Sequence, residues 1–89
     1  MNVRYSRCAL TQLEAVHEYL LDRNRSATGT VAASIRSTIA RLGDMPSLGK
    51  ATDEESVCVI VEPGYHYRVF YNILDREVFV LRILHGRQQ

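Results

Sequence analysis

Hydrophobic residues near the start of the chain recur with the spacing of an amphipathic helix. Over residues 9–21 they lie three or four positions apart, which places them on one helical face that ends near Asp22. Ser6 is a favourable N-cap for this helix, and Val3 and Tyr5 before it favour a short strand. The pattern therefore predicts a strand that runs directly into a helix.

A second stretch has the same helical period. Its apolar positions are spaced by four or three residues: Val31, Ile35, Ile39 and Leu42. Gly43 follows, where a left-handed residue often ends a helix. Because few residues separate the two helical stretches, the simplest arrangement is an antiparallel helical hairpin.

The hydrophobic period becomes strand-like in the last third of the chain. β-Branched and aromatic residues gather in three segments, 57–61, 65–73 and 78–84. Turn-forming residues separate them at Glu62-Pro63-Gly64 and at Asp75-Arg76. The order β-α-α-β-β-β predicts a two-layer α+β domain, with the helical hairpin packed on one face of an antiparallel sheet.

The segment between the second helix and the first of these strands is acidic. Residues 45–49 read as a turn-rich link, and Asp53, Glu54 and Glu55 are expected in a solvated loop. Over residues 44–62 five carboxylates stand against one lysine, a net charge of −4. The acidic middle contrasts with the basic end of the chain.

The last predicted strand does not alternate between apolar and polar positions. Val78 to Leu81 are all apolar. On the preceding strand, the positions two residues before and after Phe70, which share its face, are polar. If helices cover one sheet face, some of these apolar groups are left on the other. We interpret them as a surface for a bound partner; the alternative is that twist or the following residues bury both faces.

Composition limits the kind of protein. The chain has 89 residues, 46% apolar and 24% charged, with a net charge of +1, which predicts one globular domain over residues 1–89 and excludes a disordered chain. Near-neutrality argues against a protein that coats nucleic acid or an anionic membrane. A domain of this size buries only about 60–65% of its unfolded surface, so a partner would add stability.

Two isolated cysteines and the lack of an apolar N-terminal segment indicate a reduced, cytoplasmic protein. Cys8 and Cys58 have no metal-site spacing, so we expect no metal and no cofactor. The longest apolar run covers only residues 57–61, too short for a membrane span.

Several segments together resemble the RelE/ParE superfamily of toxins from bacterial type II toxin–antitoxin modules. They are Val3-Arg4-Tyr5-Ser6, Leu48-Gly49-Lys50, Tyr67-Arg68-Val69-Phe70-Tyr71 and the run from Val80 to Arg87. The ending His85-Gly86-Arg87 is closer to the ParE-like branch. Residues 50–64 match least, and no tyrosine follows Tyr71, unlike RelE-like members with a C-terminal tyrosine.

The resemblance implies a cytoplasmic toxin that a cognate antitoxin, ParD-like or related, neutralises. The toxin would meet operator DNA only through the antitoxin. ParE-like members inhibit DNA gyrase without chemistry of their own, and this is the activity we expect. The alternative is RelE-like, ribosome-dependent and metal-independent cleavage of mRNA. A third interpretation is a regulatory member whose main role is to complex the antitoxin.

The resemblance also suggests which side chains act. Target-binding residues would be Arg68, Arg82, His85 and Arg87; in a nuclease Arg68, Arg82 and His85 would be catalytic, helped by Lys50 and His66. Antitoxin-binding residues would be Phe70, Val78 and Val80. Two structural alternatives stay open: His85 hydrogen-bonded to a backbone carbonyl, and Arg68 paired with Glu62 or with an antitoxin carboxylate.

Overall fold

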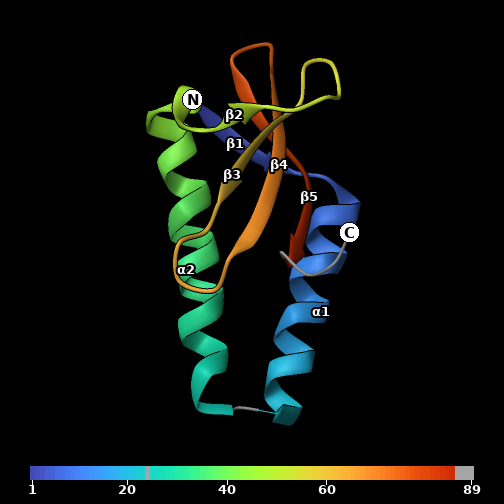
Figure 1. Ribbon diagram of the computed structural model, residues 1–89, viewed down its shortest axis with the longest axis vertical. Helices are drawn as coiled ribbons and strands as arrows, with labels where there is room; N and C mark the ends of the chain where they lie inside the picture. Colours follow the sequence, from blue (N-terminus) through green and yellow to red (C-terminus); the bar gives the residue numbers. More distant parts are fainter. Residues whose placement is uncertain (24, 86–89) are drawn as a thin grey trace.

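The described part of the chain forms two helices and five strands, together with one short 3₁₀ turn (Figure 1). The structure is a computed structural model and describes residues 1–23 and 25–85. The elements are β1 (Asn2–Tyr5), α1 (Arg7–Arg23), α2 (Arg25–Asp44), the 3₁₀ turn η1 (Pro46–Leu48), β2 (Lys50–Ala51), β3 (Cys58–Val61), β4 (Tyr67–Leu74) and β5 (Glu77–His85). The predicted order is confirmed, with β2 as an addition.

The five strands form one mixed sheet in the order β1-β5-β4-β3-β2. Strands β3, β4 and β5 pair antiparallel, as predicted, and the additional β2 is antiparallel to β3. The prediction of a wholly antiparallel sheet is wrong for β1, which lies parallel to β5 with Val3 opposite Val78. The helical hairpin and three strands lie between β1 and β5 in the chain. β5, which pairs with both β1 and β4, is a central strand.

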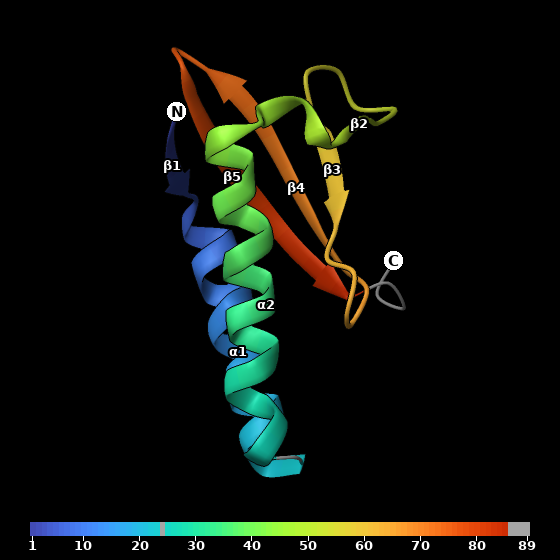
Figure 2. The ribbon, with the colours of Figure 1, turned by 90° about the vertical axis from the view of Figure 1, so that its left-hand side faces the viewer.

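The helical hairpin covers one face of the sheet (Figure 2). Its apolar stripe packs on β4 and β5, and Ile35, Ile39, Val69 and Val80 are fully buried in this layer. The end of the hairpin projects beyond the sheet. The two-layer α+β fold is thus confirmed, and no helix of residues 1–23 or 25–85 covers the opposite sheet face.

Ser6 and Gly43 lie at the two helix ends that were predicted from the sequence. Ser6 caps α1, because its Oγ accepts a hydrogen bond from the backbone N–H of Ala9 at 2.9 Å. The prediction for Gly43 is wrong: α2 continues to Asp44, and no glycine of the described chain has a positive φ. Gly43 instead allows close packing, since a Cβ there would lie 3.0 Å from the carbonyl oxygen of Met1.

The segment between α2 and β2 is held to the sheet by the buried hydroxyl of Tyr71. Tyr71 Oη accepts the N–H of Gly49 at 2.9 Å and donates to the carbonyl of Pro46 at 2.7 Å. Burial raises the pKa of the Tyr71 hydroxyl, which favours the protonated donor.

The turn between β4 and β5 is tight. Asp75 and Arg76 both have positive φ, 51° and 62°, as a two-residue hairpin turn requires. Neither α1 nor α2, as the structure describes them, is long and apolar enough to cross a membrane.

Candidate functional site

The sheet face away from the helices, here called the open face, is where the predicted cations lie. On β4, Tyr67, Val69 and Tyr71 are buried under the helices, so Arg68 and Phe70 between them point to the other side. Cross-strand register extends this assignment to the neighbouring strands. The open face is formed by Asn2, Arg4, Lys50, Val59, Val61, Arg68, Phe70, Asn72, Leu74, Glu77, Phe79, Arg82 and Leu84.

A β-bulge decides which way the end of β5 points. Tyr71 pairs with Val80 but Phe70 pairs with Arg82, so Leu81 is the extra residue. Beyond the bulge Arg82 turns to the open face and Ile83 turns into the core. The bulge explains why the sequence of β5 does not alternate.

Two side chains, one at the N-cap of α1 and one within α1, form hydrogen bonds with the backbone at the bulge. Ser6 Oγ donates to the carbonyl of Leu81 at 2.7 Å, and Gln12 Oε1 accepts the N–H of Ile83 at 2.6 Å. Backbone groups on both sides of the bulge are therefore satisfied.

Two residues expected to contact an antitoxin are in the core instead. Val78 and Val80 are 0% exposed, because β5 is central and these positions face the helices. They offer no surface to a partner in this fold, so we correct that expectation. Phe70 does lie on the open face, where it is partly exposed.

Arg82 is held between an aromatic ring and a carboxylate. Its guanidinium carbon lies 4.4 Å from the centroid of the Phe70 ring, and its Nη2 lies 3.1 Å from Glu54 Oε1. Glu54 belongs to the acidic cluster predicted as a solvated loop, and residues 53–55 are indeed exposed between β2 and β3. The acidic segment therefore reaches a cation of the open face.

The carboxylate of Glu62 serves the turn between β3 and β4. It accepts hydrogen bonds from Ser34 Oγ at 2.5 Å and from the N–H groups of Gly64 and Tyr65, both at 2.7 Å. Burial disfavours the charged form, but these hydrogen bonds outweigh it and hold the pKa of Glu62 below its ordinary value. Glu62, considered above as a partner of Arg68, thus directs its oxygens at the turn and α2.

His85 lies on the other side of the sheet from the two arginines. It pairs with Tyr67, and the two rings meet edge to face with centroids 5.0 Å apart. The structure therefore brings Arg68 and Arg82 together on one face and separates His85 from them. Lys50 shares the open face, His66 lies in the β3–β4 turn, and Arg87 falls outside the described residues.

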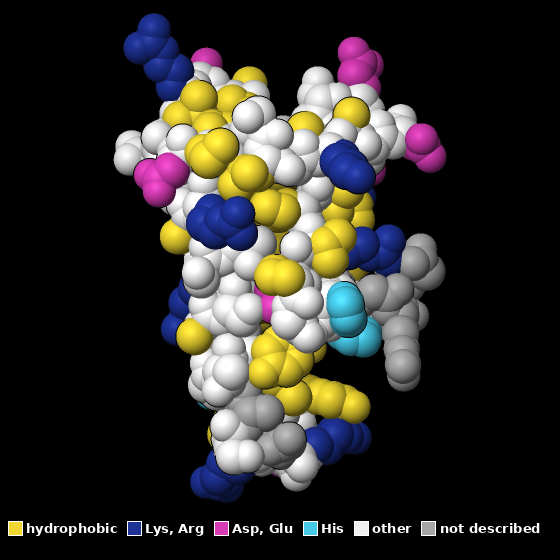
Figure 3. Space-filling view, turned by 60° about the vertical axis from the view of Figure 1, so that its left-hand side comes forward, with side chains coloured by type: hydrophobic (Ala, Val, Ile, Leu, Met, Phe, Trp, Pro, Cys, Tyr) yellow, Lys and Arg dark blue, Asp and Glu magenta, His cyan; other side chains and the backbone are white. Residues whose placement is uncertain are grey.

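His85 instead borders an apolar groove between the helical hairpin and the sheet. The groove has a volume of about 750 Å³ and is lined mainly by Val16, Tyr19, Leu20, Tyr65, Tyr67 and Ile83. Hydrophobic side chains gather below the histidines, toward the end of the hairpin, in Figure 3. The groove exists because the hairpin extends past the sheet and leaves part of its apolar stripe uncovered.

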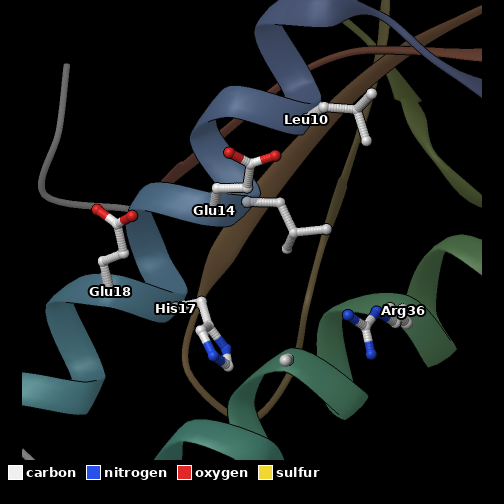
Figure 4. Close-up of a pocket in the computed structure, with 7 residues that line it drawn as sticks. Leu10, Glu14, His17, Glu18 and Arg36 are labelled. Carbon is white, nitrogen blue, oxygen red and sulfur yellow. The ribbon is translucent and has the colours of Figure 1, made fainter.

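A second hollow, of about 410 Å³, lies between α1 and α2 (Figure 4). His17 points toward α2, which supplies Arg36, whereas Glu18 points away. Among the described residues no three His, Cys, Asp or Glu side chains are placed to hold a metal ion.

Comparison with known proteins identifies the family. A family model described as the ParE toxin of the type II toxin-antitoxin system, parDE, matches residues 3–89. The chain belongs to the ParE toxin family. No match was found among curated protein sequences.

The fold of this ParE-family chain is similar to that of several solved toxin–antitoxin structures. The chromosomal ParDE system of P. aeruginosa has a TM-score of 0.85 at 16% identity, over 96% of this chain and 95% of that one. The intact E. coli RelBE toxin-antitoxin complex has a TM-score of 0.71 at 16% identity, over 98% of each chain. The RelBE2 complex of Mycobacterium tuberculosis has a TM-score of 0.71 at 22% identity, over 94% and 95%. At these identities the likeness shows the fold.

Part of the candidate site of this ParE-family chain was missed from the sequence. Val59, Val61 and Phe79 join the open face, and Glu54 reaches it. Once the strand pairing is known, counting every second residue from Arg68 and taking the cross-strand partners gives Val59 and Val61. No local sequence pattern connects Glu54 with Arg82.

Proposed function

We propose that this type II toxin acts in the cytoplasm by binding DNA gyrase through its open face, and that a ParD-like antitoxin neutralises it. The observation that supports this function is the separation of His85 from Arg68 and Arg82. The open face then offers cations and apolar groups for binding, with no histidine or tyrosine of the described residues beside them, and its carboxylates Glu54 and Glu77 are paired with arginines.

RNA cleavage without a metal needs more than cations. A group must take the proton from the attacking hydroxyl, and another must protonate the leaving oxygen. Across the part of the chain that the structure describes, no histidine or tyrosine belongs to the open face. The one predicted catalytic histidine contacts Tyr67 on the far side.

Protein recognition makes better use of the same side chains. Arginine and aromatic residues are enriched where protein interfaces are most strongly held, and aliphatic neighbours exclude water around them. Arg82 stacked on Phe70 beside Val59 fits this pattern. The net charge of +1 is also modest for a protein that must bind ribosomal RNA.

The apolar groove is the surface that we assign to the antitoxin. A segment that folds on binding can cover a groove of about 750 Å³ with apolar anchors at helical or strand spacing. The groove and the open face lie on opposite sides of the sheet, although Leu84 of the open face also borders the groove. The antitoxin would then also be the only component that contacts operator DNA.

A supercoiling assay tests the proposed activity. Purified toxin added to gyrase and relaxed plasmid should block supercoiling and accumulate gyrase-linked cleaved DNA. Arg68→Ala together with Arg82→Ala should weaken inhibition about tenfold or more, the scale of two interface residues. Arg36→Ala, an exposed arginine of α2 away from the open face, is the matched control.

Ribosome-dependent mRNA cleavage is the second candidate, because the fold also matches RelBE complexes. Its test is an in vitro translation reaction in which cut sites in the message are mapped. Site-specific cuts with unchanged gyrase activity would replace the proposed function by this one.

A further inference from the structure

The loop between β2 and β3 has a defined shape. Thr52 Oγ1 lies 2.9 Å from the carbonyl of Val57 and accepts the N–H of Glu54 at 3.1 Å. Backbone bonds from Thr52 N–H to Val57 and from Val57 N–H to Glu54 close the loop at 3.0 and 3.1 Å. Glu54 therefore belongs to a loop whose backbone is held by hydrogen bonds.

The carboxylate of Glu54 is placed where an incoming anion would bind. It lies 3.1 Å from Arg82 Nη2, while the flat face of the same guanidinium covers Phe70. Arginine over an aromatic ring, beside further cations, is also an arrangement that binds a phosphate backbone and stacks a base. Asp53 and Glu55 flank Glu54 and add negative charge to the same loop.

We propose that Glu54 is a specificity-determining residue that excludes nucleic acid from the open face. Its carboxylate is an intramolecular competitor for Arg82, so a phosphate must displace it and meets the repulsion of the acidic loop. A protein partner can keep the Arg82–Glu54 pair and bind the apolar groups around it. This inference rests on the proposed function only in taking the open face as the target-binding surface.

RNA affinity measures this exclusion directly. The probe is a short, fluorescein-labelled single-stranded RNA of mixed sequence, followed by fluorescence anisotropy from about 50 to about 200 mM salt. Glu54→Gln should bind it about three to ten times more tightly than the wild type at the lower salt, and one freed cation should steepen the salt dependence by about 0.7 in log–log slope.

Glu55→Gln is the matched control. It removes the same charge from the same loop, but Glu55 forms no ion pair with any residue that the structure describes. Its affinity should change less than about twofold, an effect of net charge screened by salt. Thr52→Val keeps every charge but loses the hydroxyl contacts of the loop, and should shift RNA binding toward that of Glu54→Gln.

Adding Arg82→Ala to Glu54→Gln should remove the gain in affinity. The proposal is overturned if Glu54→Gln binds no better than the wild type, if Glu55→Gln gains equally, or if the gain persists without Arg82. A parallel supercoiling assay separates the two proposals: wild-type protein that leaves gyrase active refutes the proposed function, while the order of RNA affinities still decides the role of Glu54.

Discussion

Glu62 connects the β3–β4 turn to α2 through a single buried carboxylate. Three donors, the Ser34 hydroxyl and two backbone N–H groups, converge on it, and the side chain is 0% exposed. Glu62→Gln removes the charge that these donors stabilise. We expect this change to lower the free energy of unfolding at neutral pH by about 1–3 kcal/mol.

The same carboxylate predicts a pH dependence with a definite sign. Hydrogen bonds hold its pKa below the ordinary 4.5, so the unfolded chain binds more protons in mild acid than the folded protein does. The stabilisation is complete above the unfolded pKa and is lost as the pH falls through the lower folded value. In denaturant unfolding between neutral and acid pH, the stability gap between wild type and Glu62→Gln should shrink; a constant gap would contradict the role of the charge.

Gly49 is required by a close approach rather than by its backbone angles. A Cβ there would lie 2.7 Å from Tyr71 Cε1 and 2.8 Å from the carbonyl oxygen of Val59. Gly49→Ala should therefore cost about 1–3 kcal/mol in thermal or chemical unfolding. Gly29→Ala is the control, because nothing lies within 4 Å of its Cβ position and alanine favours the helix; equal effects of the two changes would show that crowding at Gly49 is unimportant.

At the scale of elements, the bulge in β5 sets the composition of both sheet faces. Deleting Leu81 would restore simple alternation and drive Arg82 under the helices while exposing Ile83. We expect the deletion to abolish cooperative unfolding, because an unpaired buried cation costs more than a domain of this size can offset.

The substitution Leu81→Ala distinguishes an effect of strand register from an effect of side-chain packing. It keeps the bulge and removes only a half-buried side chain, so it should cost about 1–2 kcal/mol and retain a cooperative melt followed by circular dichroism. If the deletion variant melts as cooperatively as Leu81→Ala, the bulge is not what orients Arg82.

Local elements could be predicted from the sequence, but their partners could not. The helical spacing of residues 31–42 and the Asp75-Arg76 turn depend on neighbours in the chain, and both are confirmed. The parallel pairing of β1 with β5 joins opposite ends of the chain, and the two residues of β2 are too few for a periodic signal.

The candidate site was also only partly predictable from the sequence. Arg68 and Arg82 were named from the sequence, and the structure places both on the open face. Strand alternation depends on a count of residues, so the single insertion at Leu81 decides which of Arg82 and Ile83 is buried. The same count, together with the central position of β5, buries Val78 and Val80.

At the scale of the whole molecule, the hairpin and the sheet leave two surfaces, to which we assign different partners. The groove belongs to the helix side and the cations belong to the open face. Ala15→Arg places a charge on an exposed groove-lining position, whereas Ala40→Arg places one on an exposed position of α2 outside the groove.

Thermal melting with the co-expressed antitoxin tests this division. The antitoxin is expected to be the product of the reading frame next to this gene. The midpoint should rise on binding for wild type and Ala40→Arg, and should rise much less for Ala15→Arg, because binding stabilises only the folded state that it recognises. An equal rise in all three would place the antitoxin elsewhere.

Binding without chemistry has a quantitative signature. An inhibitor that acts by binding gyrase inactivates one gyrase site per bound toxin molecule, whereas one nuclease molecule cuts many messages. The decisive measurement is a titration of the toxin in a supercoiling assay at two gyrase concentrations, both above the dissociation constant. The concentration for half inhibition should rise in proportion to gyrase; no inhibition at any ratio, accompanied by cut messages in a translation reaction, would contradict a gyrase-binding toxin.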